Sequence, residues 1–446
     1  MYIARVRVEN VRGFHDARSV DLGLERPDGT YAGWTVIAGR NGSGKTSLLR
    51  AIALAISGHS SAGVLMPDSS NWITVGRDAG SVGLDLVADP VLDLSGEGDV
   101  SEEPLSLSMS WRLARPLRAT GRDPQPLLSS GNSPSAWGPW QPNAAGWFCA
   151  AYGPFRRLTG GSIDAQRLTQ GPAVISRLAS LFHEDASLAE GVSWLIDQHL
   201  RSFERRSGAA ELKEAALAVL ADGLLPDGYV VRGVDADGLW VDNNDRRFPL
   251  REMSDGYRAV TALVVDLLKQ IHDCYGEIAL DETEGSVRVV APGVVVIDEV
   301  DAHLHVTWQK RIGTWLKSHF PNMQFIVTTH SPYVCQSADP GGLIRLPGPD
   351  QDESPRVVSE DLYERVVYGS GDDAALSGLF GLESSYSDAA QRLRRELVEL
   401  EYAVVVGSAS PPDIERYRHI SGLLTSSPKA RVDEVAARLA MRPADQ

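Results

Sequence analysis

Apolar and polar residues alternate with two different periods near the start of the chain. Arg5 and Arg7 are interleaved with valines over residues 3–8, a period of two that predicts a half-buried strand. Trp34–Ala38 predicts a second strand, which leads into a glycine-rich stretch. Beyond that stretch, apolar residues fall on one face of a predicted helix: Leu48, Leu49, Ile52, Ala53 and Ile56. Strand, loop and helix follow in the order that a phosphate-binding loop requires.

The pattern changes over residues 61–245. Short alternating stretches there predict antiparallel strands or hairpin arms, and residues 172–223 have a helical pattern without sustained heptads. Tyr229–Trp240 predicts a hairpin around an Asp-Ala-Asp-Gly turn. We therefore expect an insertion made of β-arms, an irregular loop and a helical subdomain.

The irregular loop covers residues 120–147, which are rich in proline, serine and glycine. It carries three tryptophans that either form a stacking platform or anchor the loop in the core: Trp137, Trp140 and Trp147. Anchoring is the interpretation that we favour.

Strong α/β patterning returns after residue 245. Apolar residues at helical spacing run from Val260 to Ile271, and Val294–Ile297 and Phe325–Thr328 are short apolar strands. The helix predicted over Trp308–Phe320 lies between these strands, so the three elements predict a buried βαβ unit. The last hundred residues turn polar and helical, ending in two helices separated by the loop Ser408–Pro412.

These patterns predict an α/β fold whose core is split in sequence. We expect four regions: an N-terminal lobe with the glycine-rich loop, the insertion, a C-terminal lobe of the core, and a helical C-terminal region that is a candidate for docking a partner. Their predicted bounds are 1–60, 61–245, 246–345 and 346–446.

Composition and charge narrow the class of protein. Cys149, Cys274 and Cys335 have no metal-ligand spacing and predict free thiols in a reducing compartment. No apolar run reaches the roughly 20 residues that cross a bilayer, and no signal-peptide pattern is present, so we expect a cytoplasmic protein that does not contact the membrane.

The net charge of −16 disfavours a large nonspecific nucleic-acid surface. A local basic groove that contacts DNA or RNA remains open, although scattered solvated arginines are the interpretation that we favour. The arginines concerned are Arg156, Arg157, Arg246, Arg247 and Arg251.

The glycine-rich stretch matches the pattern G-x-x-x-x-G-K-[ST] in full. Backbone N–H groups of such a loop close around a phosphate, Lys45 reaches the β- and γ-phosphates, and the Thr46 hydroxyl ligates Mg²⁺. The predicted nucleotide-binding residues are Gly39, Arg40, Asn41, Gly42, Ser43, Gly44, Lys45, Thr46 and Ser47.

The strand Val294–Ile297 ends in two carboxylates, Asp298 and Glu299. An apolar strand that ends in Asp-Glu is commonplace by itself, but downstream of an intact phosphate-binding loop it predicts a Walker B motif. Asp298 is then the Mg²⁺ residue together with Thr46, and Glu299 is the general base.

Two further motifs lie on either side of this strand. Ser254, Asp255 and Gly256 open the helix that contains Val260 and resemble an ABC signature; by themselves they would be a simple helix cap. His330 follows the strand Phe325–Thr328, where a histidine can sense a γ-phosphate, although a lone histidine is more often structural.

In this order, the four motifs resemble those of ABC-type ATPases. The resemblance implies a P-loop NTPase fold of the ABC ATPase type, with a mixed sheet and an antiparallel β-subdomain, and ATP and Mg²⁺ as cofactors. It implies Glu299, Lys45 and His330 as catalytic residues. Each ATP would be clamped between the P-loop of one copy and the signature of another, so the assembly would be a homodimer or a larger assembly of dimers.

The branch of the family is indicated by three further segments. Ile3–Phe14 and the run Glu299-x-x-x-His303-Leu304-His305 resemble RecF-like and OLD-like AAA ATPases. The segment Tyr152–Arg157, together with the short helical C-terminus, resembles stand-alone ATPases of bacterial antiphage defence systems, of the Septu-, PARIS- or retron-associated type. The resemblance makes Asp301–Leu304 a D-loop that crosses to the partner copy. No glutamine precedes Gln125, so a transporter-type Q-loop is not evident, and no long coiled-coil arm is predicted.

Three further features of the sequence bear on metal binding, nucleotide contact and nuclease activity. His303 and His305 lack a third ligand, which disfavours a metal site. Arg12 and Phe14 are candidates for contact with adenine. The chain shows no Toprim nuclease pattern after the switch histidine.

The first functional hypothesis is a sensor that hydrolyses ATP slowly and regulates a separately encoded effector, a nuclease, in antiphage defence. In that hypothesis the tail helices dock the partner through Leu393, Leu397 and Leu400. Ordinary packing of the tail on the ATPase core is the competing interpretation. The alternative is a RecF-like DNA-repair ATPase that clamps duplex DNA. A degenerate scaffold without turnover is disfavoured because Lys45, Asp298 and Glu299 are all present.

Overall fold

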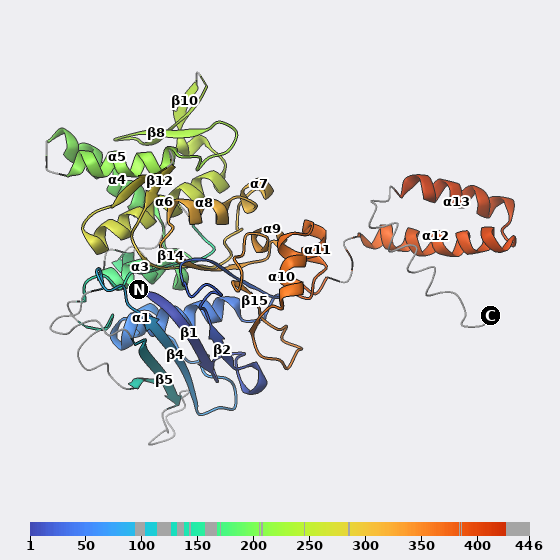
Figure 1. Ribbon diagram of the computed structural model, residues 1–446, viewed down its shortest axis with the longest axis horizontal. Helices are drawn as coiled ribbons and strands as arrows, with labels where there is room; N and C mark the ends of the chain where they lie inside the picture. The colour runs from blue at the N-terminus through green and yellow to red at the C-terminus, as the bar shows by residue number, and fades with distance from the viewer. Residues whose placement is uncertain are drawn as a thin grey trace. The chain divides into compact units, whose positions relative to one another are not determined.

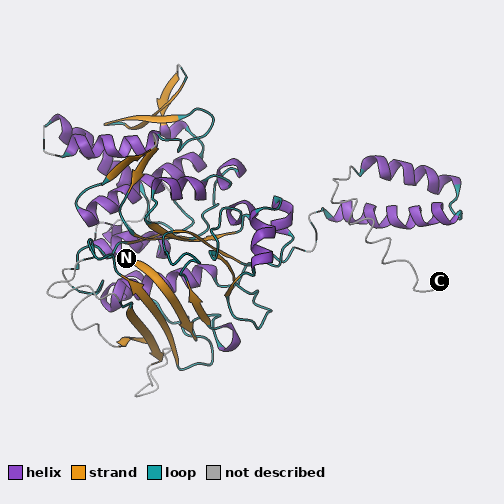
Figure 2. Cartoon of the chain, viewed as in Figure 1, coloured by secondary structure: helices purple, strands orange, loops and turns teal. Residues whose placement is uncertain are grey.

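The computed structural model is shown in Figures 1 and 2. It divides into two units, Met1–Gly381 and Leu382–Gln446. The described residues are 1–93, 103–113, 126–131, 138–141, 144–156, 167–169, 171–204, 206, 208–244, 246–283, 286–382, 384 and 386–424.

The first unit is built on a six-stranded sheet with the order β16-β15-β3-β14-β13-β7. Five of its strands are parallel, and β16 pairs antiparallel with β15. In the order of the sheet, the strands are Arg356–Val357, Leu343–Arg345, Gly33–Ala38, Met323–Thr329, Gly293–Ile297 and Cys149–Tyr152. The expected βαβ unit is confirmed, since β13 and β14 pair in parallel with α8 (Ile312–His319) between them in sequence.

Every residue of β13 and β14 is buried, yet alternate side chains enter different cores. Val295 and Ile297 pack in one core, whereas Val294 and Val296 pack in the other. A parallel sheet covered on both faces therefore explains why these strands appear in the sequence as continuous apolar runs rather than as alternating ones.

One face of this sheet is covered by α1 (Lys45–Leu65), α3 (Ala173–Phe182) and a second sheet (Figure 1). The second sheet is antiparallel, with the order β2-β1-β4-β5-β6 and bounds Val20–Gly23, Tyr2–Glu9, Ala79–Val87, Leu105–Leu113 and Pro126–Gly131. Helix α1 is long and apolar enough to span a membrane, but most of it is buried between the two sheets as the helix that follows the glycine-rich loop.

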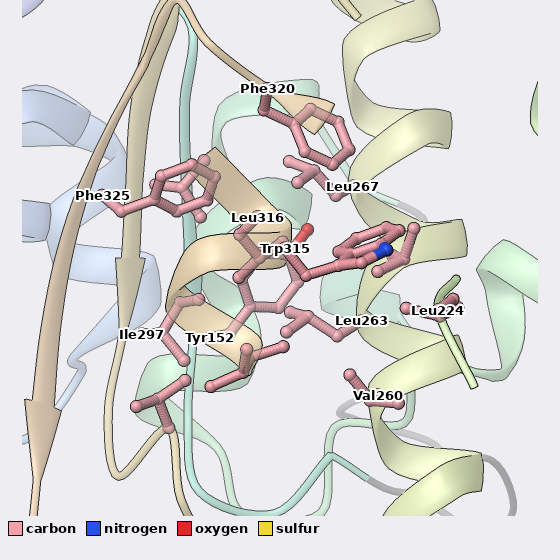
Figure 3. Close-up of a cluster of buried hydrophobic side chains, with 14 of the residues drawn as sticks. Tyr152, Leu224, Val260, Leu263, Leu267, Ile297, Trp315, Leu316, Phe320 and Phe325 are labelled. Atoms are coloured by element: carbon pink, nitrogen blue, oxygen red, sulfur yellow. The ribbon is translucent and has the colours of Figure 1, made fainter. Parts of the chain in front are cut away.

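The other face packs against α6 (Asp255–Tyr275) and its neighbours. Figure 3 shows Val260, Leu263 and Leu267 of α6 facing Trp315, Leu316 and Phe320 beside the sheet. The surrounding elements are α4 (Ala189–Phe203), α5 (Ala209–Ala221), β8 (Val230–Asp235), β9 (Gly238–Asn243), β10 (Arg246–Pro249), η2 (Leu250–Glu252), β11 (Leu280–Thr283), β12 (Ser286–Val289), α7 (Val306–Gln309), α9 (Pro332–Cys335), α10 (Glu360–Val367) and α11 (Gly371–Ala375).

The predicted α/β class, with its mixed sheet and antiparallel β-subdomain, is confirmed, and so is the hairpin, whose strands β8 and β9 pair around the expected turn. The region 61–245 is not a separate insertion, because it contributes strands to both main sheets of the first unit. Its strand β4 pairs with β1, and its strand β7 extends the central sheet beside β13. A buried strand of four residues is too short to show a period, so the sequence pattern did not reveal β7.

Two of the three loop tryptophans can be placed. The Trp140 indole N–H donates to the Ala55 carbonyl over 3.0 Å and covers Gly58, where φ of +76° interrupts α1. Trp147 is 4% exposed, while Trp137 lies outside the described residues. Both placed side chains anchor the loop in the core, as favoured above.

A buried polar contact ties α6 to the central sheet. The Tyr152 hydroxyl at the end of β7 donates to the Asp266 carboxyl group over 2.9 Å. Burial raises the pKa of Asp266 to about 6, although the hydrogen bond from Tyr152 opposes this shift. The folded protein therefore retains the proton of Asp266 at pH values where the unfolded chain has lost it.

We expect Asp266→Asn to stabilise the protein above pH 6. With a raised folded-state pKa, Asp266 stabilises the fold most at low pH, and this stabilisation is lost as pH rises from about 4 through about 6. Removing the charge should increase the free energy of unfolding at pH 8 by about 1–3 kcal/mol, which urea denaturation would measure.

Asp273→Asn on the same helix is the matched control. Burial raises the pKa of Asp273, but hydrogen bonds with His272 and Lys269 and their charges together lower it below its usual value, so loss of this carboxylate should not stabilise the protein at pH 8. An Asp266→Asn variant that is no more stable than wild type at pH 8 would contradict the prediction.

The second unit is a helical hairpin. Helix α12 (Asp388–Val406) and α13 (Pro411–Leu423) match the two helices predicted for the tail. Leu397 and Ile420 are buried, and Arg416 pairs with Glu396 over 2.6 Å. Residues 346–381 belong to the first unit, so the structural division falls later than the predicted boundary at residue 345.

Candidate functional site

The glycine-rich loop joins the carboxyl end of β3 to the start of α1. Gly42 and Gly44 have φ of +77° and +99°, which other residues adopt only with strain. A Cβ atom on Gly44 would lie 2.7 Å from the Phe14 ring, so the loop rests directly on that ring. Phe14 is 1% exposed, which excludes it as an adenine contact; Arg12 is exposed and remains a candidate.

Lys45 is folded back into the loop. Its ammonium donates to the carbonyls of Gly39 over 2.7 Å and Arg40 over 3.2 Å. Burial lowers the pKa of Lys45, while the charges of Asp298 and Glu299 oppose this shift. The ammonium therefore lies at the loop, where a phosphate oxygen would meet it.

Two features of the loop fit a bound phosphate. The Ser43 hydroxyl is buried and has no hydrogen-bond partner among the described residues. The first N–H groups of α1, beginning at Lys45, lack acceptors within the helix because of their position. Buried polar groups are normally satisfied, so this donor set is suited to an anion.

Asp298 follows β13 and joins this strand to α1 and β14. Its carboxylate accepts from the Thr46 hydroxyl over 2.7 Å and from the Thr328 hydroxyl over 2.5 Å. The Asp298 side chain is 1% exposed. One hydroxyl and one carboxylate at the phosphate loop fit Mg²⁺, which takes oxygen ligands and few of them from protein. Thr328 was not predicted as a site residue, because a threonine in an apolar strand carries no distinctive signal.

Glu299 begins a tight turn directly after β13. Its φ is +45°, and its N–H donates to the Thr328 hydroxyl over 2.8 Å. A non-glycine residue in this conformation costs about 1–3 kcal/mol and persists where neighbouring contacts hold it. Glu299 is half-buried in this turn, and its charge acts on Lys45 of the loop.

His330 is exposed at the carboxyl end of β14. Its backbone N–H donates to Asp301 over 3.3 Å, and Asp301 also accepts from the Thr329 hydroxyl. Burial lowers the pKa of His330, and the positive charge of Lys45 lowers it further. The imidazole is thus neutral near pH 7 and lies within the electrostatic influence of Lys45.

Ser254, Asp255 and Gly256 are at the amino end of α6, as predicted. Ser254 and Asp255 are exposed, and the Asp255 carboxylate pairs with Arg258 one turn later. Ser254 occupies the N-cap position, but its side chain makes no capping hydrogen bond, so a simple cap does not explain it.

Gly256 lies against the backbone of the next motif. A Cβ atom on Gly256 would collide with the His303 carbonyl oxygen, and the Cα of Leu304 is 3.7 Å from the same point. His303 has φ of +65°, which turns the chain at this contact.

The side chain of His305 caps α7 by accepting from the Thr307 N–H. Among the described residues, no group of three histidine, cysteine or acidic side chains forms a metal site.

Gly256→Ala should therefore separate the start of α6 from the 303–304 backbone. Inserting a methyl group against a carbonyl costs about 1–3 kcal/mol, and we expect denaturation to show this loss. Gly63→Ala is the control, because Gly63 has open space around it and alanine favours the helix. Equal stabilities of the two variants would contradict the prediction.

The arginines considered for a basic groove differ in their exposure to solvent. Arg156 is 5% exposed, so for this residue both the surface groove and the favoured interpretation as a solvated arginine are wrong. Arg246 and Arg247 of β10 and Arg251 of η2 are exposed, and Arg247 stacks over Trp240. Arg157 lies outside the described residues.

Known proteins share sequence with this chain. Residues 93–336 match the family described as "AAA domain, putative AbiEii toxin, Type IV TA system", and residues 5–71 match one described as "AAA domain". The chain is 24% identical to the Septu protein PtuA of Bacillus mycoides (strain KBAB4), over 74% of this chain and 38% of that protein. It is 33% identical to the "Retron Ec83 probable ATPase" of Escherichia coli, over 27% of this chain and 21% of that protein.

Among solved structures, the Smc head bound to the C-winged helix domain of ScpA aligns with 16% identity and a TM-score of 0.46, covering 80% of this chain and 98% of that chain. The chain spans less than half the length of either relative named above. The first family match covers more than half of the 446 residues, and the chain therefore belongs to the AAA-domain family described as "AAA domain, putative AbiEii toxin, Type IV TA system".

Proposed function

We propose that this chain binds ATP and Mg²⁺ and hydrolyses ATP in the manner of ABC-type ATPases. The observation that carries the proposal is the pair of hydrogen bonds to Asp298, which join the first turn of the loop helix to the ends of β13 and β14. This contact draws Lys45, Glu299 and His330 to one edge of the sheet.

The chemistry assigned to each residue follows from its position. Lys45 and the backbone N–H groups of the loop bind the β- and γ-phosphates. Thr46 and Asp298 hold Mg²⁺, which neutralises phosphate charge when bound. The Glu299 carboxylate accepts a proton from the attacking water, and neutral His330 donates a hydrogen bond to the γ-phosphate.

The complete site requires a second copy of the chain. Ser254 and Asp255 are exposed at the amino end of α6, and within the described part of the chain no hydrogen bond joins them to the loop around Lys45. Their hydroxyl and helix amides are suited to the γ-phosphate of ATP held by another copy. The assembly is then a homodimer or a larger assembly of dimers.

In its biological setting, we propose that the ATPase regulates a separately encoded effector, a nuclease, in antiphage defence. The Septu and retron relatives support this role. In the tail unit, Leu397 is buried and is not available for docking, whereas Leu393 and Leu400 are partly exposed. Tyr402, Val405 and Val406 at the end of α12 are exposed and are better candidates for contact with the effector.

Light scattering after size exclusion, run with and without Mg·ATP, tests the proposal together with phosphate release. We expect ATP to increase the mass and phosphate to be released. A monomer that is indifferent to ATP would refute the shared site. ATP-dependent, salt-sensitive binding of duplex DNA in the same samples would instead favour the DNA-clamp alternative. The absence of any co-purifying effector would count against the defence role.

A further inference from the structure

A buried arginine lies directly beneath the turn that carries Glu299. Arg156 follows β7, the strand that pairs with β13 in the central sheet. Its guanidinium donates to the carbonyls of Gly153 (3.3 Å), Asp298 (3.2 Å), Glu299 (3.1 Å), Val300 (3.2 Å) and Ala302 (3.3 Å). Four of these five acceptors belong to a single stretch of backbone, residues 298–302.

These carbonyls come from a segment that lies outside any helix or strand. Residues 298–302 form turns between β13 and α7, and Glu299 has φ of +45°. Buried carbonyl groups outside regular structure need another donor. Arg156 supplies donors to four of them, beside the Ala302 N–H that donates to the Glu299 carbonyl and the Val300 N–H that donates to the Thr328 carbonyl of β14. One side chain that follows a different strand therefore contributes to holding the turn.

Arginine suits this position better than lysine. Its planar guanidinium has five N–H donors in a fixed arrangement, whereas an ammonium has three donors at one point. Burial lowers the pKa of Arg156 to about 10, and the charges of Asp301, Asp298 and Glu299 oppose the shift. The side chain therefore stays protonated at neutral pH, and its charge balances the nearby carboxylates.

The backbone of Arg156 is itself held in place. A Cβ atom on Gly153 would collide with the Ser180 carbonyl of α3, and the Ser180 hydroxyl donates to the Ala151 carbonyl over 3.0 Å. Tyr152, one residue before Gly153, donates to Asp266 of α6. The segment that presents the guanidinium is thus fixed by two helices before it reaches the turn.

We propose that Arg156 is a positioning residue that holds the 298–302 turn, and through it the Glu299 carboxylate, in the conformation needed for turnover. The part of this inference that concerns turnover rests on the ATPase function proposed above. The part that concerns the turn does not, because the hydrogen bonds join groups within one chain.

The test compares Arg156→Lys with Arg26→Lys in the full-length chain. Arg26 is a matched control: it is also buried, pairs with Asp339 over 3.0 Å and donates to the Ala32 carbonyl, next to the amino end of β3. Two quantities are measured for each variant: hydrogen–deuterium exchange of peptides that cover residues 298–304, and kcat and KM for ATP.

For Arg156→Lys we expect faster exchange across 298–304 and a kcat lower by about 10- to 100-fold, with KM within about threefold of wild type. Arg26→Lys should change neither quantity. Unchanged exchange in a folded Arg156→Lys protein would overturn the inference. So would faster exchange with kcat within about twofold of wild type. If wild type itself releases no phosphate, the proposed function fails, while the exchange experiment still decides whether Arg156 holds the turn.

Discussion

Replacing Glu299 with glutamine is expected to reduce phosphate release by about 100- to 10,000-fold, the range that a positioned general base contributes. Glutamine preserves the size of the side chain and cannot accept a proton. The N–H of residue 299 would still donate to Thr328, and the backbone carbonyl would still accept from Arg156, so the turn itself should persist. ATP should therefore still bind.

The Glu299→Gln variant should therefore separate ATP binding from ATP turnover. Because ATP is bound but not consumed, the Glu299→Gln protein should accumulate in the ATP-dependent assembly, and light scattering should show a larger assembled fraction than in wild type. Glu364→Gln, an exposed position on α10, is the control. Phosphate release at the wild-type rate from the Glu299→Gln protein would exclude Glu299 as the base, whatever the state of assembly.

The second large effect is expected for Lys45→Met. The ammonium that now donates to the Gly39 and Arg40 carbonyls would no longer be available to the phosphates. Loss of a charge-assisted hydrogen bond in a buried site should weaken ATP binding by about 10- to 100-fold. Turnover at subsaturating ATP and the ATP-dependent assembly should fall with it.

Calorimetric titration with ATP and Mg²⁺ measures this change directly. The free protein should keep its stability to within about 1 kcal/mol, because methionine fills the buried stem position without the desolvation cost that lowers the pKa of Lys45. Lys213→Met, on α5 and paired with Glu214, is the control for the loss of a lysine. ATP affinity equal to that of wild type would show that the loop binds nucleotide without this side chain.

The motifs themselves were readable from sequence because each depends on adjacent residues. The loop from Gly39 to Thr46 needs glycines where φ is positive and a lysine beside the loop carbonyls, and a short pattern records both requirements. The Asp298-Glu299 pair follows an apolar strand whose complete burial produces a continuous run of apolar residues. Local chemistry and local burial therefore predicted the βαβ unit of the sheet and the positions of these two motifs at its edge.

Contacts between distant residues were not readable in the same way. Thr328 reaches Asp298 across two neighbouring strands, and Phe14 supports Gly44 from the connection between β1 and β2. A threonine in an apolar strand and a phenylalanine near a loop are both ordinary, so the sequence does not reveal these contacts. Phe14 was a candidate for contact with adenine, but its position under the loop makes it a packing residue.

Arg156 is the clearest case of this limit. In the sequence it is one of two adjacent arginines and was grouped with surface residues; in the structure its guanidinium meets four carbonyls more than 140 residues away in sequence. The sequence by itself determined the glycine-rich loop, the apolar strand before Asp298 and the α/β class, because these depend on residue type and short-range period. Only the tertiary structure decided which side chains hold the 298–302 turn. Any residue can supply a backbone carbonyl as a hydrogen-bond acceptor, so these contacts leave no pattern in the sequence of the turn.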